Sequence, residues 1–216
     1  MESQNFTDSI SRIFVLSLPE RADRISELWP HLEEFDIDLG KTSIIPSIKN
    51  PNGALGLKET LHSVLIKNYF TQNYPILILE DDAEFIVPKE ELHEVVLKAI
   101  KELPEGWLQL YLGVQLIIRP ESKYSDHLIQ LPMGYSTHAI IYSKKGVETI
   151  LEKWNPLNDD PIDVYFSKVI HPLGKSFCTI PMVCSQRESK SNIDSRFSSW
   201  KFCLEDKFNE YTKHLK

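Results

Sequence analysis

Two hydrophobic patterns follow one another along this chain. The first is an unbroken run of apolar residues, and the second is a stretch in which apolar residues recur every three or four positions. Runs of the first kind are typical of strands buried on both faces, and the second spacing is typical of amphipathic helices. The run around which the chain is organised is Ile76–Leu79, in the sequence PILILEDDAEF. Pro75 precedes this run and three carboxylates follow it. We therefore predict a short strand that is buried inside a parallel sheet.

The same pattern predicts strands and helices in alternation along the chain. The predicted strands cover residues 11–18, 44–45, 76–79, 108–112, 117–118, 138–142 and 175–183. The predicted helices cover residues 24–35, 56–70, 89–103, 147–154, a short piece that begins at Pro161, and 204–215. Pro30 predicts a kink or two short pieces in the first helix, and Pro181 places the last strand at a sheet edge. This alternation is typical of an α/β fold with a Rossmann-like, mostly parallel central sheet flanked by helices.

Three carboxylates, Glu80, Asp81 and Asp82, stand where the central strand is predicted to leave the sheet. In open α/β folds, ligand crevices lie at the carboxyl ends of strands. Adjacent carboxylates repel one another, and a divalent cation with oxygen ligands, Mn²⁺ or Mg²⁺, would offset this repulsion. Because alternate side chains of a strand face opposite sides, Glu80 and Asp82 are the better pair of ligands. The alternative is an acidic turn that is simply solvated.

Two arginines, Arg21 and Arg24, lie between the first predicted strand and the helix that follows it. A guanidinium group in this place is suited to grip a pyrophosphate or to stack on a base. The alternative is the ordinary charged first turn of a solvated helix. His62 lies on the predicted helix 56–70, where a lone histidine is more often structural than catalytic.

Composition narrows the class of protein. The length of 216 residues favours one domain, 1–216, with residues 1–10 as a flexible N-terminus. The net charge of −7 argues against a broad nucleic-acid surface, which needs clustered lysine and arginine. The start, MESQNFTDSISR, lacks the features of a secretory signal, and no apolar run approaches the roughly 20 residues that span a bilayer. Three cysteines without a CxxC pair fit a reducing compartment, so we expect a cytoplasmic protein without a membrane span.

Seven stretches, spread in order along nearly the whole chain, resemble glycosyltransferase family 25. This family includes lipooligosaccharide galactosyltransferases and procollagen galactosyltransferases. The stretches are IFVLSLPERADR, ALGLKETLHSVL, ILILEDDAEF, GWLQLYLG, STHAIIYSKKGVETIL, PIDVYF and SQRESKSNID. The EDD that follows an apolar strand is the most specific of them, and the order and spacing of all seven support the resemblance.

The resemblance implies a GT-A type fold, a nucleotide-sugar donor such as UDP-galactose or UDP-glucose, usually Mn²⁺, and transfer with inversion at the anomeric carbon. The acceptor would be a saccharide or a hydroxylated protein or lipid-linked molecule. Three positions depart from the family pattern. Ser17 stands where the family has Asn or a similar polar residue, and His138 replaces a small residue. Thr60 and Leu61 stand in place of a Ser-His pair, with His62 one place late.

The resemblance also assigns roles to individual residues. Asp82 is the best candidate metal ligand and acts in catalysis through the metal, with Glu80 or Asp81 holding the ribose or a metal-bound water. Asp163, in PIDVYF, is the best candidate for the base that takes the acceptor's proton or for a further metal ligand; alternatively, it caps the helix that follows it. Candidate contacts to the cofactor, mainly its diphosphate, are Ser17, Arg21, Arg24, Thr60, Lys175, Gln186 and Arg187.

Two other readings of the function stay open. The first is a catalytically inactive relative that keeps the fold and binds a sugar or a protein, which the altered Ser-His position favours. The second is a metal-dependent phosphate-transfer enzyme or hydrolase built on the same acidic strand end. The sequence contains no GxxxxGK[ST] loop, which counts against one large branch of that second class.

Overall fold

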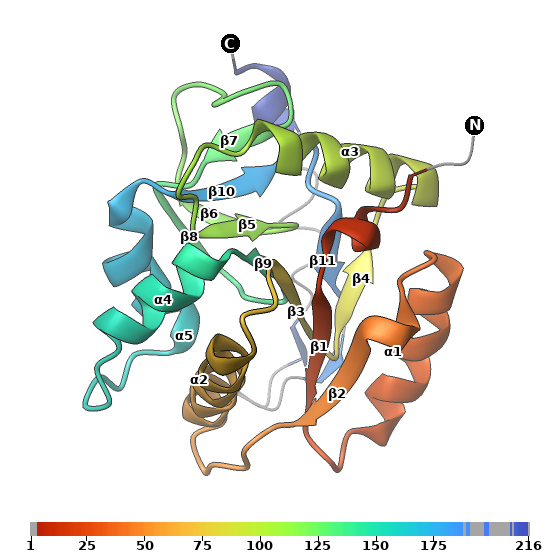
Figure 1. Ribbon diagram of the computed structural model, residues 1–216, viewed down its shortest axis with the longest axis vertical. Coiled ribbons are helices and arrows are strands. Elements are labelled where there is room, and N and C mark those ends of the chain that lie inside the picture. Colours follow the sequence, from red (N-terminus) through yellow and green to blue (C-terminus); the bar gives the residue numbers. More distant parts are fainter. Residues whose placement is uncertain (1–3, 188, 191–196, 199–207, 209, 216) are drawn as a thin grey trace.

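A computed structural model describes residues 4–187, 189–190, 197–198, 208 and 210–215 of the chain. Within them, a seven-stranded sheet has the order β2-β1-β3-β9-β5-β10-β7. Its strands, in that order, are Thr42–Pro46, Arg12–Ser17, Ile76–Glu80, Ala139–Tyr142, Gln109–Tyr111, Ser176–Thr179 and Leu128–Gln130. The sheet runs through the middle of the molecule, with helices around it (Figure 1).

The α-helices are α1 Ala22–Glu34, α2 Gly53–Thr71, α3 Lys89–Glu102, α4 Lys144–Lys153 and α5 Ile162–Tyr165, and residues 208 and 210–213 are helical as well. A π-helix, Phe166–Ile170, continues α5, and short 3-10 helices cover Phe6–Ser9, Leu39–Lys41 and His171–Leu173. Three smaller pairs of strands complete the structure: β4 Ala83–Phe85 with β11 Cys184–Gln186, β6 Gln115–Ile118 with β8 Met133–Tyr135, and β12 Ser189–Lys190 with β13 Phe197–Ser198.

The central sheet is mostly parallel. β1 pairs in parallel with β2 and β3, and β5 pairs in parallel with β10. β9 runs antiparallel to both β3 and β5, so β5 and β3 point the same way, and β7 runs antiparallel to β10. Five strands therefore share one direction and two oppose it. The predicted α/β class, with a mostly parallel sheet flanked by helices, is confirmed.

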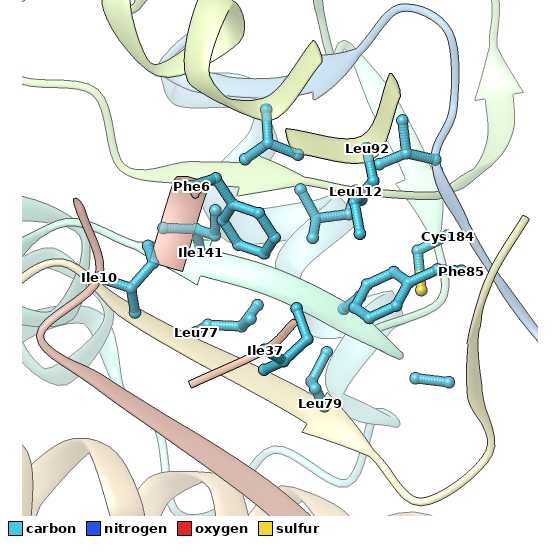
Figure 2. Close-up of a cluster of buried hydrophobic side chains, with 14 of the residues drawn as sticks. Phe6, Ile10, Ile37, Leu77, Leu79, Phe85, Leu92, Leu112, Ile141 and Cys184 are labelled. Atoms are coloured by element: carbon cyan, nitrogen blue, oxygen red, sulfur yellow. The ribbon is translucent and has the colours of Figure 1, made fainter. Parts of the chain in front are cut away.

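β3 is buried on both of its faces, as its unalternating apolar run predicts. Leu77 and Leu79 belong to a core cluster with side chains of α1 and α3, whereas Ile76 and Ile78 pack in a second cluster with side chains of α2 and α4. All four are at most 2% exposed. Figure 1 shows α1 and α2 on opposite sides of β1 and β3, and Figure 2 shows Leu77 and Leu79 within the first cluster. These two layers hold the carboxyl end of β3 in place.

The start of the chain corrects one expectation. We predicted a flexible segment over residues 1–10, but Phe6–Ser9 forms a 3-10 helix that Asn5 caps through its side chain. Phe6 and Ile10 are 0% and 1% exposed and lie in the core close-up of Figure 2. Two apolar side chains in this polar segment are enough to anchor residues 4–10 on the sheet, because burying each is worth about 1.5–3 kcal/mol.

Several other predicted elements differ from those in the structure. The alternative of two short pieces at Pro30 is wrong, because α1 is a single helix through that residue, whereas the kink stays a prediction. β10 lies between β5 and β7 rather than at an edge, and it ends at Thr179, so Pro181 removes no hydrogen bond from the ladder. β7 and β8 were not predicted. Of the predicted helix 204–215, residues 208 and 210–213 are helical, and residues 204–207 and 209 lie outside the described residues.

The described part of the chain contains no helix with the length and apolar character needed to cross a membrane. That the chain forms a single domain stays a prediction.

Candidate functional site

A cavity of about 620 Å³ opens at the carboxyl ends of β1, β2 and β3. Cavities of this size are typical of sites for small molecules and cofactors. Nine of the residues predicted for the site line it: Ser17, Arg21, Arg24, Glu80, Asp81, Asp82, Asp163, Gln186 and Arg187. The parallel direction of β1 and β3 explains six of the nine, from Ser17 to Asp82, because it brings the residues at the end of each strand to one edge of the sheet. Asp163 comes from α5, and Gln186 and Arg187 come from the end of β11.

Both carboxylate oxygens of Asp81 accept hydrogen bonds from neighbouring side chains. The hydroxyl of Ser17, at the end of β1, donates to Oδ2 at 2.7 Å. Nη1 of Arg24, from the first turns of α1, donates to Oδ1 at 2.6 Å. Asp81 is 5% exposed and Arg24 is 8% exposed, so this is a buried ion pair with both carboxylate oxygens bonded. Ser17 and Arg24 therefore hold the acidic turn against the start of α1.

Asp82 is bonded more loosely than Asp81. Nη1 of Arg24 donates to its Oδ2 at 3.1 Å, and Nε2 of Gln186 donates to its Oδ1 at 3.5 Å. Burial raises the pKa of Asp82, Arg24 opposes that rise, and the charge of Asp81 adds to it. The Asp82 carboxylate is thus a charged group with incomplete compensation at the wall of a cavity.

Glu80 is the last residue of β3, and its carboxylate accepts a hydrogen bond from Oγ1 of Thr137 at 2.6 Å. Burial raises the pKa of Glu80 to about 8, and repulsion from Asp82 adds to the rise. The Thr137 hydrogen bond acts in the opposite direction, while Asp81 and Asp163 raise the pKa further. The raised pKa favours the protonated form of Glu80 near neutral pH, unless a bound cation offsets the burial and the repulsion from the neighbouring carboxylates.

Asp163 lies in the first turn of α5, next to the loop between β8 and β9. Its Oδ1 accepts from the backbone N–H of Val164 at 2.8 Å, and its Oδ2 accepts from that of Ser136 at 3.4 Å. Ser136 has a φ of 79°, in the left-handed region that a serine seldom adopts. The alternative that Asp163 caps this helix is wrong, because the N-cap is Pro161 and makes no side-chain bond, and Asp163 lies inside the first turn. Its carboxylate bonds the N–H of the next residue and lines the cavity.

Gln186 and Arg187 reach the site through the pairing of β11 with β4, which sets Gln186 beside Ala83. The Arg187 guanidinium donates to the carbonyl of Asp81 at 2.7 Å and to the carboxylate of Glu27 at 3.2 Å. Its backbone N–H donates to the carbonyl of Asp82 at 2.7 Å. Arg187 therefore clamps the backbone of the acidic turn, in addition to lining the cavity.

Arg21 lines the cavity and makes a two-nitrogen contact with the exposed carboxylate of Asp23. This hydrogen bond is the main reason that the pKa of Arg21 is raised, so the group stays charged. Because its partner lies largely in solvent, exchanging that partner for a phosphate has a small cost.

Two predicted cofactor contacts lie outside the cavity. Oγ1 of Thr60 donates to the carbonyl of Gly56 and accepts from the N–H of Ile48, both at 2.7 Å, so it secures the connection between β2 and α2. Lys175 precedes β10, at the opposite end of that strand, and donates to the carbonyl of Glu105. Neither side chain is brought near the carboxylates.

The two histidines of unassigned role are structural. His62 stacks on Trp154 with ring centroids 4.1 Å apart and an interplanar angle of 6°. His138 is completely buried and lies 3.3 Å from the carbonyl oxygen of Cys184 through its Nε2. Burial lowers the pKa of His138 to about 4, which keeps the ring neutral at physiological pH.

Several lining residues were missed from the sequence, among them Lys49, Gln115, Tyr135, Ser136 and Thr137. Ser136 and Thr137 stand in the STHAIIY stretch that resembles the family, which was the available signal for both. Gln115 and Tyr135 lie in β6 and β8, which are too short to recognise fully by pattern, and Lys49 lies in the connection between β2 and α2.

The carboxylate pair fits a hard divalent cation. Among the described residues, no group of three or more His, Cys, Asp or Glu side chains is arranged to hold a metal ion. Mn²⁺ and Mg²⁺ bound together with a substrate phosphate commonly use one or two protein carboxylates, so such a trio is not required. Glu80 and Asp82 offer oxygen ligands whose pKa values are raised by burial first, with Asp82 adding to the shift of Glu80 and Asp81 adding to the shift of Asp82. Asp81 is the less suitable ligand, since both its oxygens are bonded within the protein.

No family model matches the chain, and no curated protein matches it either. Among solved structures, the chain is similar to A197 from STIV, with 14% identity over 78% of this chain and 81% of that one and a TM-score of 0.44. It is also similar to a glycosyltransferase involved in the glycosylation of the major capsid of PBCV-1, with 12% identity over 78% of this chain and 92% of that one and a TM-score of 0.45. Similarity of this size is too low to establish a shared family or activity, so membership of family 25 stays a prediction.

Proposed function

We propose that this protein is a glycosyltransferase that moves a hexose, galactose or glucose, from a UDP-sugar to a hydroxyl group of a saccharide, protein or lipid-linked acceptor, with inversion. The observation that carries the proposal is the convergence of unlike charges around one cavity of about 620 Å³. Carboxylates come from β3 and α5, and guanidinium groups come from the start of α1. A donor of this class carries two phosphates and a sugar, which need both kinds of group.

The basic side chains are suited to the diphosphate. Arg21 is held by a largely exposed partner and can exchange it for a phosphate oxygen, which guanidinium groups bind with two parallel hydrogen bonds. Lys49 lines the same wall and pairs with Glu20, another rim residue. Glu80 and Asp82 would hold Mn²⁺ or Mg²⁺, which when bound neutralises charge that develops on a departing diphosphate.

Asp163 is suited to take the proton of the acceptor hydroxyl. An inverting transfer needs one base on the side of the sugar opposite to the leaving group. The two backbone N–H groups that Asp163 accepts from, those of Ser136 and Val164, fix the carboxylate in one orientation at the cavity wall. A base that is fixed before the substrate arrives loses little entropy in the reaction.

Donor binding and turnover test this proposal. We expect UDP with Mn²⁺ to raise the melting temperature by about 5 °C at saturating concentrations. We expect Asp82→Ala to abolish this rise, whereas Glu59→Ala, which removes an exposed carboxylate of α2, keeps it. Hydrolysis of UDP-, GDP- and CMP-sugars, measured on the same variants, then identifies the donor. No thermal shift with any nucleoside diphosphate would contradict the proposal.

A catalytically inactive binding module is the second candidate function. It is favoured by the contact of Arg24 with both Asp81 and Asp82, because the protein's own cation then balances part of the acidic turn. Such a module would show the thermal shift with a nucleotide or sugar, and turnover of every donor would stay at background with every metal tried.

A further inference from the structure

Lys58 is a buried cation for which the chemistry proposed above has no use. The residue lies on α2 and is 4% exposed. Its ammonium donates to the carbonyl of Asn158 at 2.5 Å, to the side-chain oxygen of Asn158 at 2.8 Å and to the carbonyl of Asp160 at 3.1 Å. An ammonium group has three donors, so these three bonds use all of them.

Two aromatic rings lie next to this ammonium group. Nζ of Lys58 lies 5.6 Å from the ring centre of Trp154 and 5.0 Å from that of Tyr165. Burial lowers the pKa of Lys58, and the charges of Asp160 and Asp159 oppose that shift. A methionine would fill such an apolar space without the cost of burying a charge. The ammonium is therefore explained by what it bonds, which is the inward-facing backbone of residues 158–160.

The segment that Lys58 bonds leads directly into the proposed active site. It belongs to the connection between α4 and α5, and the next three residues, Pro161, Ile162 and Asp163, line the cavity. Lys58 itself comes from α2, whose first two turns line the same cavity through Gly53, Ala54 and Leu57. The three hydrogen bonds thus join two walls of the site.

We propose that Lys58 is a positioning residue, which holds residues 158–160 against α2 and thereby fixes the Asp163 carboxylate at the cavity wall. This inference rests on the proposed function, in which Asp163 takes the acceptor's proton. Without the ammonium, two carbonyls of the loop lose their buried donor, and the start of α5 is free to shift. A displacement of about 1 Å at a reacting group is enough to lower a rate about 100-fold.

Lys58→Met tests the proposal, with Lys168→Met as the matched control. Lys168 contacts the same loop, since its Nζ bonds the Asp160 carboxylate at 2.9 and 3.0 Å, but its side chain is 57% exposed. We expect Lys58→Met to lower kcat about 100-fold with KM for the donor changed by less than about two-fold, because the loop contains none of the proposed diphosphate contacts. We expect Lys168→Met to leave both constants within about two-fold, and Lys58→Arg, which keeps a buried donor, to recover about ten-fold of the loss.

Hydrogen exchange supplies a second measurement that does not depend on turnover. We expect faster amide exchange over residues 158–165 in Lys58→Met than in the wild type or in Lys168→Met. A normal kcat in Lys58→Met, equal losses in donor affinity and rate, or unchanged exchange over this segment would each overturn the proposal. A wild-type protein that neither binds nor turns over any donor would refute the proposed function instead, and the exchange comparison would still test the role of Lys58.

Discussion

Asp81 and Asp82 are adjacent in the chain, yet their side chains have different surroundings. Asp81 has short bonds to Ser17 and Arg24, at 2.7 and 2.6 Å, whereas the contacts of Asp82 with Arg24 and Gln186 measure 3.1 and 3.5 Å. The first residue thus fixes the turn after β3, and the second keeps its charge available to the cavity. This division agrees with the alternation argued from the strand, which made Glu80 and Asp82 the pair of ligands.

The ion pair of Arg24 with Asp81 gives a prediction about stability. Arg24→Met removes a buried cation and leaves the Asp81 carboxylate without it, so we expect the free energy of unfolding to fall by about 3–5 kcal/mol. Arg24→Met combined with Asp81→Asn removes both charges and should recover more than half of that loss. Urea denaturation at pH 7 measures both. Arg21→Met is the control, because its partner Asp23 is largely exposed and the pair should be worth less than about 1 kcal/mol. Equal losses in the two single variants would contradict the prediction.

Elements of this fold differ in how much of their position is encoded locally. α4 begins at a local cap, three residues before the predicted start at 147: Oγ of Ser143 accepts from the N–H of Gly146 at 2.9 Å and also donates to the carbonyl of Trp107 at 2.5 Å. β7 and β8 have three residues each, too few for a period to be recognised. Long elements were therefore predictable from spacing and caps, and short ones depend on the strands that pair with them.

Replacing the cap of α4 tests the local part of this argument. Ser143→Ala leaves the N–H of Gly146 and the carbonyl of Trp107 without that hydroxyl, so we expect a loss of about 1–2 kcal/mol in the free energy of unfolding. Ser26→Ala, which removes an exposed hydroxyl in the first turns of α1, should change it by less than about 0.5 kcal/mol. Thermal unfolding of the two variants side by side measures the difference, and indistinguishable melting temperatures would rule out a stabilising cap.

At the scale of the whole molecule, buried titratable groups couple stability to pH. His171 is 1% exposed and lies between Tyr111, whose hydroxyl is 2.9 Å from Nε2, and Gly134, whose N–H donates to Nδ1 at 3.4 Å. Burial lowers the pKa of His171 to about 4 from an ordinary value of 6.5. The unfolded chain therefore binds this proton at a higher pH than the folded protein does, and the difference destabilises the fold between those two values.

The pH dependence of a His171 variant isolates this contribution. As pH falls from 6.5 to about 4, His171 should reduce the stability of the wild type with a slope of up to about 1.4 kcal/mol per pH unit, and the effect levels off below pH 4. In His171→Gln this slope is absent, so the difference in unfolding free energy between variant and wild type should move in favour of the variant over that window. Glu80 and other groups titrate in both proteins and cancel in the comparison. A difference that stays constant from pH 7 to pH 4.5 would contradict a neutral, buried His171.

The amino-acid sequence by itself determined the alternation of strands and helices, the burial of β3 and the acidic residues at its exit, because periodicity and composition act over a few neighbouring residues. Only the tertiary structure decided which charges meet there. Arg24 contacts a carboxylate 57 positions away and Gln186 contacts one 104 positions away, through the order of the parallel strands and the β11–β4 pairing. The tertiary structure also places Thr60 and Lys175 outside the cavity and shows the hydrogen bonds of Lys58. Contacts of that sequence separation depend on how the sheet is assembled, and no local pattern records that assembly.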